Sequence, residues 1–124
     1  MVLGLEKLKT RQYAEGVPIF EEGVDADEAF IIESGSVRIF TMQNNKEHDL
    51  AVLEAGAVFG EMAMIKQISH TCSAQALSRT TVAVIPRDEL FTKMAASDPL
   101  IKGLLYMLVN RLYDGNERAQ NKQA

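Results

Sequence analysis

Glycine recurs at short intervals through the first two thirds of the chain and divides it into pieces too short for long helices. The intervals are set by Gly16, Gly23, Gly35, Gly56 and Gly60. Glycine readily adopts the left-handed backbone conformations that tight turns require. The pieces between these glycines are short and apolar or alternating, which is typical of β-strands. Many short strands separated by regular turn signals predict a sandwich or a barrel.

The strand-like pieces can be placed along the chain, and one pair of them predicts a hairpin. Residues 37–42 read as a strand and residues 50–53 as its return strand. Between them lies Asn44-Asn45-Lys46, and asparagine tolerates the positive φ of a turn. Further strands are expected at 17–20, 29–32, 71–77 and 81–85. The pattern therefore predicts a β-roll of about eight strands over residues 10–86.

The last third of the chain changes to a helical period. Acidic residues after Pro86 predict a helix start at residue 87, and Pro99 suits the first turn of a second helix. An apolar stripe follows at helical spacing, formed by Leu100, Ile101, Leu104, Leu105, Leu108, Val109 and Leu112. The stripe predicts a helix that packs on the β core, or one that also pairs with its copy in a homodimer. The helices are expected over 87–113, and the polar tail 114–124 is expected to fray.

Composition narrows the class of protein. A chain of 124 residues has room for one domain, spanning residues 1–124. The net charge of −4 and a pI near 5.2 disfavour a nucleic-acid partner, which needs clustered cations. Cys72 is the single cysteine, so no intrachain disulfide forms and a cytoplasmic location is expected. No apolar run approaches the roughly 20 residues of a membrane span.

One segment carries the residue types of a nucleotide site. Gly60 permits a tight turn, and a short helix is expected directly after it, over residues 61–65. The first N–H groups of such a helix, together with its dipole, favour a phosphate. Glu61 can accept hydrogen bonds from the hydroxyls of a ribose, and the small side chain of Ala63 leaves room for a ligand. Thr71 and Ser73 offer hydroxyl groups shortly before the next strand.

Three features in this order resemble the cyclic nucleotide-binding domain family, found in catabolite activators, protein kinase A regulatory subunits and cyclic-nucleotide-gated channels. The first is Ile-Phe-Glu-Glu-Gly at residues 19–23, followed by residues 27–37. The second is Phe-Gly-Glu-Met-Ala at residues 59–63, continuing to residue 76 as a phosphate-binding cassette. The third is the pair of closing helices. The resemblance implies a mainly β fold, an eight-stranded jelly roll (a double-stranded β-helix) with a cassette helix and two C-terminal helices.

The resemblance also implies roles for individual residues. Glu61 would bind the ribose 2′-hydroxyl, N–H groups beside Gly60 the cyclic phosphate, and Thr71 the neighbourhood of that phosphate. Residues 104–109, on a helix that moves as a lid in the family, would sense the base. The ligand would be cAMP or cGMP, with no metal and no other cofactor. The implied ligand-binding set is Phe59, Gly60, Glu61, Met62, Ala63, His70, Thr71 and Cys72.

His70 departs from the family pattern, because it stands where the resemblance places a phosphate-binding arginine. Arginine is always charged and presents a fork of donors, whereas histidine is mostly neutral at neutral pH. Losing a hydrogen bond to a charged group costs about 1.5–3 kcal/mol, or about 10- to 150-fold in affinity. Two non-enzymatic functions therefore stay open. One is a cyclic nucleotide sensor that signals through its last helix to an unknown protein. The other is a degenerate domain used for protein interaction or dimerisation.

Purely structural interpretations of these residues are also open. His70 fits an exposed loop histidine, and Glu61 fits an acid stabilised by a helix dipole. Cys72 fits a small buried strand residue better than a nucleophile. His48 and His70 do not form the closely spaced histidine cluster of a cupin metal site. The acidic stretch formed by Glu21, Glu22, Asp25, Asp27 and Glu28 fits a solvated loop better than a calcium loop.

The two ends of the chain depart from the family as well. Relatives commonly begin with a longer helical segment than the one expected at residues 3–9. A transcription factor of the family would carry a helix-turn-helix domain after the last helix, and 124 residues leave no room for one.

Overall fold

The computed structural model describes residues 8–108 and 110–111, in two compact units. The first unit ends at Pro86 and the second begins at Arg87. Residues 3–7 of the expected amino-terminal segment and the tail expected over 114–124 lie outside the described residues.

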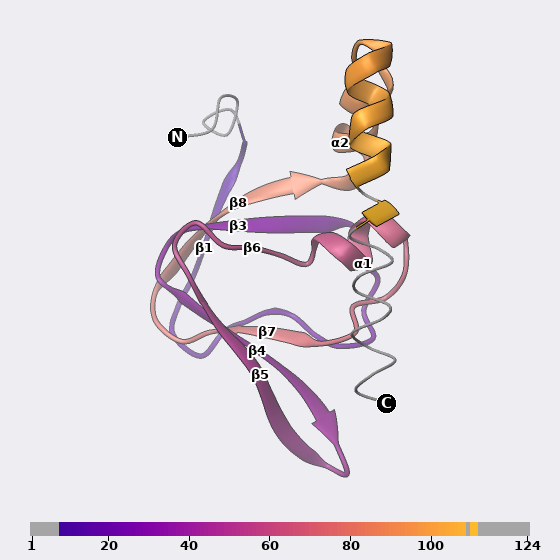
Figure 1. Ribbon diagram of the computed structural model, residues 1–124. Helices are drawn as coiled ribbons and strands as arrows, with labels where there is room; N and C mark the ends of the chain where they lie inside the picture. Colours follow the sequence, from indigo (N-terminus) through magenta and orange to yellow (C-terminus); the bar gives the residue numbers. More distant parts are fainter. Residues whose placement is uncertain (1–7, 109, 112–124) are drawn as a thin grey trace. The chain divides into compact units, whose positions relative to one another are not determined.

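The first unit is a β-roll built from two antiparallel four-stranded sheets (Figure 1). Their strand orders are β1-β8-β3-β6 and β2-β7-β4-β5. The mainly β, eight-stranded jelly-roll class predicted from the sequence is confirmed. The strands are β1 Thr10–Tyr13, β2 Pro18–Phe20, β3 Glu28–Ser34, β4 Ser36–Gln43, β5 Lys46–Glu54, β6 Val58–Phe59, β7 Ser73–Ala76 and β8 Thr80–Pro86.

The hairpin of β4 and β5 follows from its turn residues. Asn44 and Asn45 have φ values of 53° and 63°, the left-handed conformation that asparagine accepts more readily than most residues. Two such residues in succession match the twist of the flanking strands. The strands pair from Ser36 opposite Glu54 to Gln43 opposite Lys46, which confirms the predicted hairpin.

The core lies between the inner faces of the two sheets. Alternate residues of β3 and β8 point inward from one sheet, and alternate residues of β4 point inward from the other. Burying each such aliphatic or aromatic side chain stabilises the fold by about 1.5–3 kcal/mol. The buried cluster consists of Phe30, Ile32, Val37, Ile39, Phe59, Ala74, Val82 and Val84.

Strands β1 and β6 were not singled out by the sequence pattern. β1 is an edge strand of mostly polar, exposed residues that pairs with β8. β6 has only two residues, which pair with β3. Neither strand has enough alternating apolar residues to produce a period-2 signal, so only tertiary pairing identifies them.

Two helices carry labels in Figure 1: α1 Glu61–Lys66 in the β-roll and α2 Arg87–Ala95 in the second unit. Residues 99–108 and 110–111 are also helical. The Asp98 carboxylate accepts a hydrogen bond from the Leu100 N–H at 2.9 Å and so caps this helix. Many of its apolar side chains are exposed, namely Leu100, Ile101, Leu104, Tyr106, Met107 and Leu108. Within the described residues, no helix combines the length and apolar character needed to cross a membrane.

Gly35 offers a test of the β-roll, because its backbone has φ +98° and lies against another strand. A Cβ atom there would lie 2.6 Å from the Arg79 carbonyl oxygen and 2.7 Å from the Thr80 Cα. We expect Gly35→Ala to lower the free energy of unfolding by about 2–4 kcal/mol, through both strain and overpacking. Urea denaturation of both proteins measures this loss.

The matched control is Gly56→Ala, since Gly56 has φ +93° and no atom within 4 Å of a built Cβ. This variant has the strain without the clash, so a loss of about 1 kcal/mol is expected. Equal losses for the two variants would show that backbone contact at Gly35 is unimportant.

Candidate functional site

The cassette begins with a sharp turn from β6 into α1. Gly60 precedes the helix with φ 78° and ψ −2°, a left-handed conformation that suits glycine. Its carbonyl oxygen accepts the first helical hydrogen bond, from the Met64 N–H at 3.3 Å. The predicted short helix after Gly60 is confirmed, with Glu61 in its first turn.

Gly60 is also needed for close packing. A Cβ atom at this position would lie 3.3 Å from Cε2 of Phe20 and 3.4 Å from Cε1 of His70. The structure therefore brings His70 to the cassette opening, although ten positions separate the two residues. Any side chain at position 60 would press on both rings.

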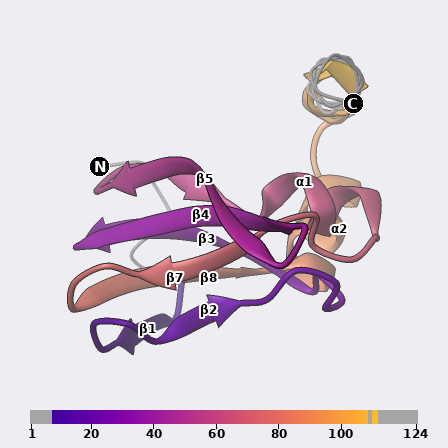
Figure 2. The same cartoon turned by 90° about the horizontal axis from the view of Figure 1, so that it is seen from below.

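Main-chain hydrogen bonds join the segment of residues 68–70 to the β2–β3 loop, residues 21–27. The Gly23 N–H donates to the His70 carbonyl and the His70 N–H donates to the Val24 carbonyl, both at 2.9 Å. The Ala26 N–H donates to the Ile68 carbonyl at 3.3 Å. As a result, the loop and α1 lie at the same end of the β-roll (Figure 2).

The His70 side chain is buried, with 6% of the residue exposed. Its ring stacks on the Phe20 ring, with centroids 3.6 Å apart and an angle of 7° between the planes. Burial lowers the pKa of His70, so the ring is neutral at neutral pH. The interpretation of His70 as an exposed loop histidine is therefore wrong, because the β2–β3 loop covers it.

Phe20 joins this stack to the core. Its ring centroid lies 6.0 Å from that of Phe30 and 5.9 Å from that of Phe59, and these two lie 5.3 Å apart. Aromatic pairs at such distances contribute about 0.5–1.5 kcal/mol beyond area burial. The position of the His70 ring is thus set by a packed aromatic cluster.

Glu61 is half-buried at the start of α1. Burial raises the pKa of its carboxyl, and a hydrogen bond involving its own backbone partly opposes the rise. A desolvated carboxylate favours hydroxyl donors that restore lost hydrogen bonds. This environment suits the role expected for Glu61 as a partner of ribose hydroxyls.

The other predicted site residues lie in varied surroundings. Phe59 and Ala63 are buried, Met62 and Cys72 are half-buried, and Thr71 is exposed. Phe59 belongs to the core cluster. The Gly60 backbone lies close to the His70 ring, whereas Thr71 is exposed.

Cys72 packs partly against the core, but it is half-buried and lies just before β7, so the expectation of a buried strand residue is wrong in both respects. Burial, and to a smaller extent the charges of Glu22 and Glu61, raise the pKa of its thiol, while a hydrogen bond with Thr71 lowers it. Since the thiolate is the reactive form, these surroundings keep Cys72 a poor nucleophile.

The acidic β2–β3 region has more specific contacts than a solvated loop requires. The Glu22 carboxylate accepts hydrogen bonds from the Thr41 hydroxyl at 2.9 Å and the Met42 N–H at 3.2 Å. The Glu28 carboxylate pairs with both terminal nitrogens of Arg11, each at 3.1 Å. These two acids therefore tie the region to β4 and β1. Across the described residues, no three metal-ligating side chains gather into a cluster that could hold a metal ion.

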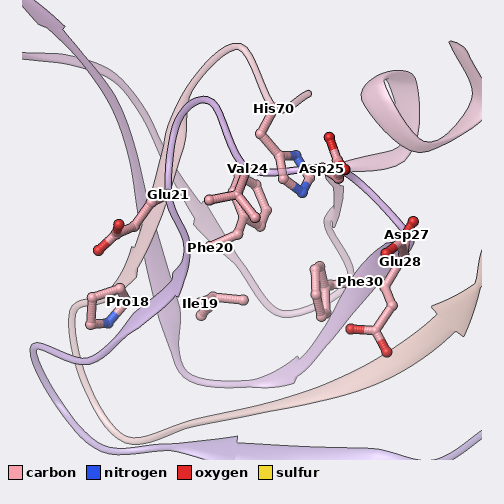
Figure 3. Close-up of a pocket in the computed structure, with 10 residues that line it drawn as sticks. All are labelled: Pro18, Ile19, Phe20, Glu21, Val24, Asp25, Asp27, Glu28, Phe30 and His70. Atoms are coloured by element: carbon pink, nitrogen blue, oxygen red, sulfur yellow. The ribbon is translucent and has the colours of Figure 1, made fainter. Parts of the chain in front are cut away.

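A cavity of about 400 Å³ lies between the β2–β3 region and His70 (Figure 3). Of the predicted site residues, only His70 is among those that line it. The sequence does not predict this cavity, because its walls come together only through the pairing of the loop with residues 68–70. The lining residues are Pro18, Ile19, Phe20, Glu21, Val24, Asp25, Asp27, Glu28, Phe30 and His70.

The burial of His70 predicts a pH-dependent contribution to stability. Because its pKa is lowered in the folded protein, the unfolded chain binds the proton more readily. The contribution of His70 is complete above its ordinary pKa of about 6.5 and is lost as the pH falls through the lower folded value. We expect His70→Gln to reduce the loss of stability between about pH 7 and pH 5, measured by urea denaturation.

His48→Gln is the matched control, since His48 is an exposed residue of β5. The raised pKa of Glu61 contributes with the opposite sign, favouring the fold at low pH, and both variants retain it. If His70→Gln and His48→Gln have the same pH profile, His70 is not held neutral by the fold.

The chain is similar to known cyclic nucleotide-binding proteins. The cyclic nucleotide-binding domain model matches residues 10–97. The cyclic AMP receptor protein of Thermus thermophilus is 28% identical over 98% of this chain and 61% of its own length. The cAMP-dependent protein kinase regulatory subunit of Candida albicans is 31% identical over 64% of this chain and 17% of its own. The chain thus spans less than two thirds of these curated relatives.

Solved structures share the fold. The Thermus thermophilus catabolite activator protein has a TM-score of 0.76 at 28% identity, covering 98% of this chain and 57% of that one. The half-site-occupied form of the EAL enzyme Bd1971 has a TM-score of 0.77 at 29% identity, covering 88% and 98%. Structures of that enzyme include cAMP-bound and cGMP-bound forms. With the family model matching most of the β-roll and α2, this chain belongs to the cyclic nucleotide-binding domain family.

Proposed function

We propose that this protein is a non-enzymatic sensor of cAMP or cGMP, with the ligand at the cassette around α1. The observation that carries the proposal is the family match over residues 10–97, combined with a cassette that retains its glycine turn and Glu61. The sensor would act in the cytoplasm through an unknown protein partner, without a nucleic-acid partner.

In this proposal, Glu61 accepts hydrogen bonds from the ribose and the first-turn N–H groups of α1 face the cyclic phosphate. The half-buried Glu61 carboxylate forms a stronger hydrogen bond with a hydroxyl donor than an exposed carboxylate would, because less water competes for it. Thr71 adds a hydroxyl beside the phosphate. Phe59, Met62, Ala63 and Cys72 shape the surroundings of the ligand.

The charge state of His70 sets the affinity for a cyclic phosphate in this proposal. The neutral, buried ring offers at most one donor, and charging it requires desolvation to be overcome. A bound phosphate favours the charged form, so nucleotide binding and protonation of His70 strengthen each other. The proposal therefore includes weak binding that improves as the pH falls.

Signalling would use the helix of residues 99–111. A ligand that binds better to one position of this helix shifts its population toward that position. Leu104 and its apolar neighbours on this helix are the proposed contacts to the base. Residue 109 of the expected base-sensing segment lies outside the described residues.

The test is His70→Arg, assayed by calorimetric titration with cAMP and with cGMP. A charged, two-donor group in place of a neutral ring should raise affinity about 10- to 150-fold. In the wild-type protein, millimolar nucleotide should raise the melting temperature.

Glu61→Gln in the His70→Arg background should remove most of the gain, since an amide is a weaker acceptor than a carboxylate. Glu33→Gln, at an exposed position of β3, is the control and should bind as the parent does. A folded His70→Arg protein that ignores both nucleotides at millimolar concentration would contradict the sensor proposal.

A second candidate function is a degenerate domain that serves as a dimerisation or interaction module. Two observations favour it: the stacked, neutral state of His70, and the exposed apolar side chains of residues 100–108. An apolar helix face of this kind is suited to pairing with a second copy. Dimerisation through this helix is compatible with either function.

For dimerisation, we expect sedimentation to show a wild-type dimer at micromolar concentration and a monomer for Leu104→Glu. The added charge would be buried without a partner in the paired helices. Asn110→Glu adds the same charge at an exposed polar position of the helix and should leave the dimer intact. A wild-type protein that stays monomeric at every concentration would contradict the pairing.

A further inference from the structure

Glu22 anchors the loop that covers His70 to two strands of the β-roll. Its N–H donates to the Ser73 hydroxyl oxygen at 2.9 Å, and Ser73 is a buried residue at the start of β7. One oxygen of its carboxylate, Oε1, accepts hydrogen bonds from the Thr41 hydroxyl at 2.9 Å and from the Met42 N–H at 3.2 Å. The main chain of Glu22 is therefore held by β7 and its side chain by β4.

The Met42 N–H lies beyond the part of β4 that pairs with β7. This pairing ends at Phe40 opposite Ser73. Figure 1 shows that the far end of the β4–β5 hairpin projects past the other strands of the β-roll. Glu22 Oε1 accepts the Met42 N–H at the place where a further residue of β7 would do so. A charged acceptor makes a stronger bond to an N–H group than a neutral carbonyl does, so Glu22 links the hairpin firmly to the loop.

The neighbours of Glu22 in the sequence hold His70. Two positions earlier, the Phe20 ring stacks on the imidazole with 3.6 Å between centroids, as Figure 3 shows. Directly after Glu22, Gly23 and Val24 form the two main-chain hydrogen bonds of 2.9 Å with His70. One short stretch of chain thus contains the stacking partner of the ring, both main-chain partners of the residue, and the anchor to β4 and β7.

We propose that Glu22 is a positioning residue for His70: its bonds to β4 and β7 hold the β2–β3 loop closed over the imidazole and keep the ring stacked on Phe20. Anchoring to two strands prevents the loop from pivoting about either one. Because His70 stands in the proposed nucleotide site, the consequence of this role for ligand binding rests on the proposed function. The role itself concerns the protein without ligand.

The first experiment measures the pKa of the His70 ring by NMR in the full chain, for the wild type and for Glu22→Ala. Glu22 is exposed, so the substitution leaves the core intact. Burial holds the wild-type pKa below its ordinary value of about 6.5. Without the anchor, water reaches the ring, and we expect the pKa to rise toward that value. Loss of a negative charge by itself lowers the pKa of an imidazole, so a rise reports an opened loop.

Other charged groups near the ring are the same in every variant. The carboxylates that line the cavity together with His70 are those of Glu21, Asp25, Asp27 and Glu28.

Hydrogen exchange of main-chain amides tests the same link. The Gly23 and His70 N–H groups should exchange about tenfold faster in Glu22→Ala, as expected for the loss of a charge-assisted hydrogen bond. The N–H of buried Ile32, which donates to the Ala57 carbonyl at 3.0 Å, should be unaffected. Glu22→Gln should give a smaller change in both experiments, because the amide oxygen still offers Met42 a neutral acceptor.

The matched control is Glu47→Ala. Glu47 is an exposed carboxylate of the same hairpin, and it pairs with Arg38 at 3.0 Å. This variant should keep the wild-type pKa of His70 and the wild-type exchange rates. A folded Glu22→Ala protein with the wild-type pKa, or with changes that Glu47→Ala reproduces, would overturn the proposal. These measurements contain no nucleotide, so their outcome is separate from that of the cAMP and cGMP titrations that test the sensor proposal.

Discussion

The main-chain pairing of His70 with the β2–β3 loop is the contact on which the candidate nucleotide site and the adjacent cavity depend. Two hydrogen bonds of 2.9 Å hold His70 between Gly23 and Val24. The same pairing places the imidazole on Phe20 and against Gly60. The aromatic cluster beneath then transmits the rigidity of the β core to the site.

The burial of the His70 ring sets its charge state at the proposed nucleotide site. Toward α1, a cyclic phosphate would meet N–H groups, Glu61 and a ring that resists protonation. Burial keeps this ring neutral, since desolvation penalises the imidazolium. In the proposed nucleotide site, this neutral ring would hold a cyclic phosphate less tightly than a charged side chain would.

Much of the fold could be predicted because its signals are local. Asn44 and Asn45 accept positive φ and so predict the hairpin, and the glycine before Glu61 predicts a turn into a short helix. Strand β1 and strand β6 could not be predicted in this way, since edge pairing with β8 and β3 supplies their stability. The burial of His70 was also beyond the sequence, because the covering residues lie more than forty positions away.

The sequence by itself determined the class of fold and the glycine turn that opens the cassette. These depend on short-range rules: glycine conformations, alternation of apolar residues, and the spacing of a motif. Only the tertiary structure decided that His70 is neutral and stacked, that Glu22 and Glu28 are held by specific partners, and that a cavity forms beside them. The burial and the electrostatic environment of a side chain depend on segments that are distant in the chain. The linear pattern of residues does not indicate which of these segments come into contact.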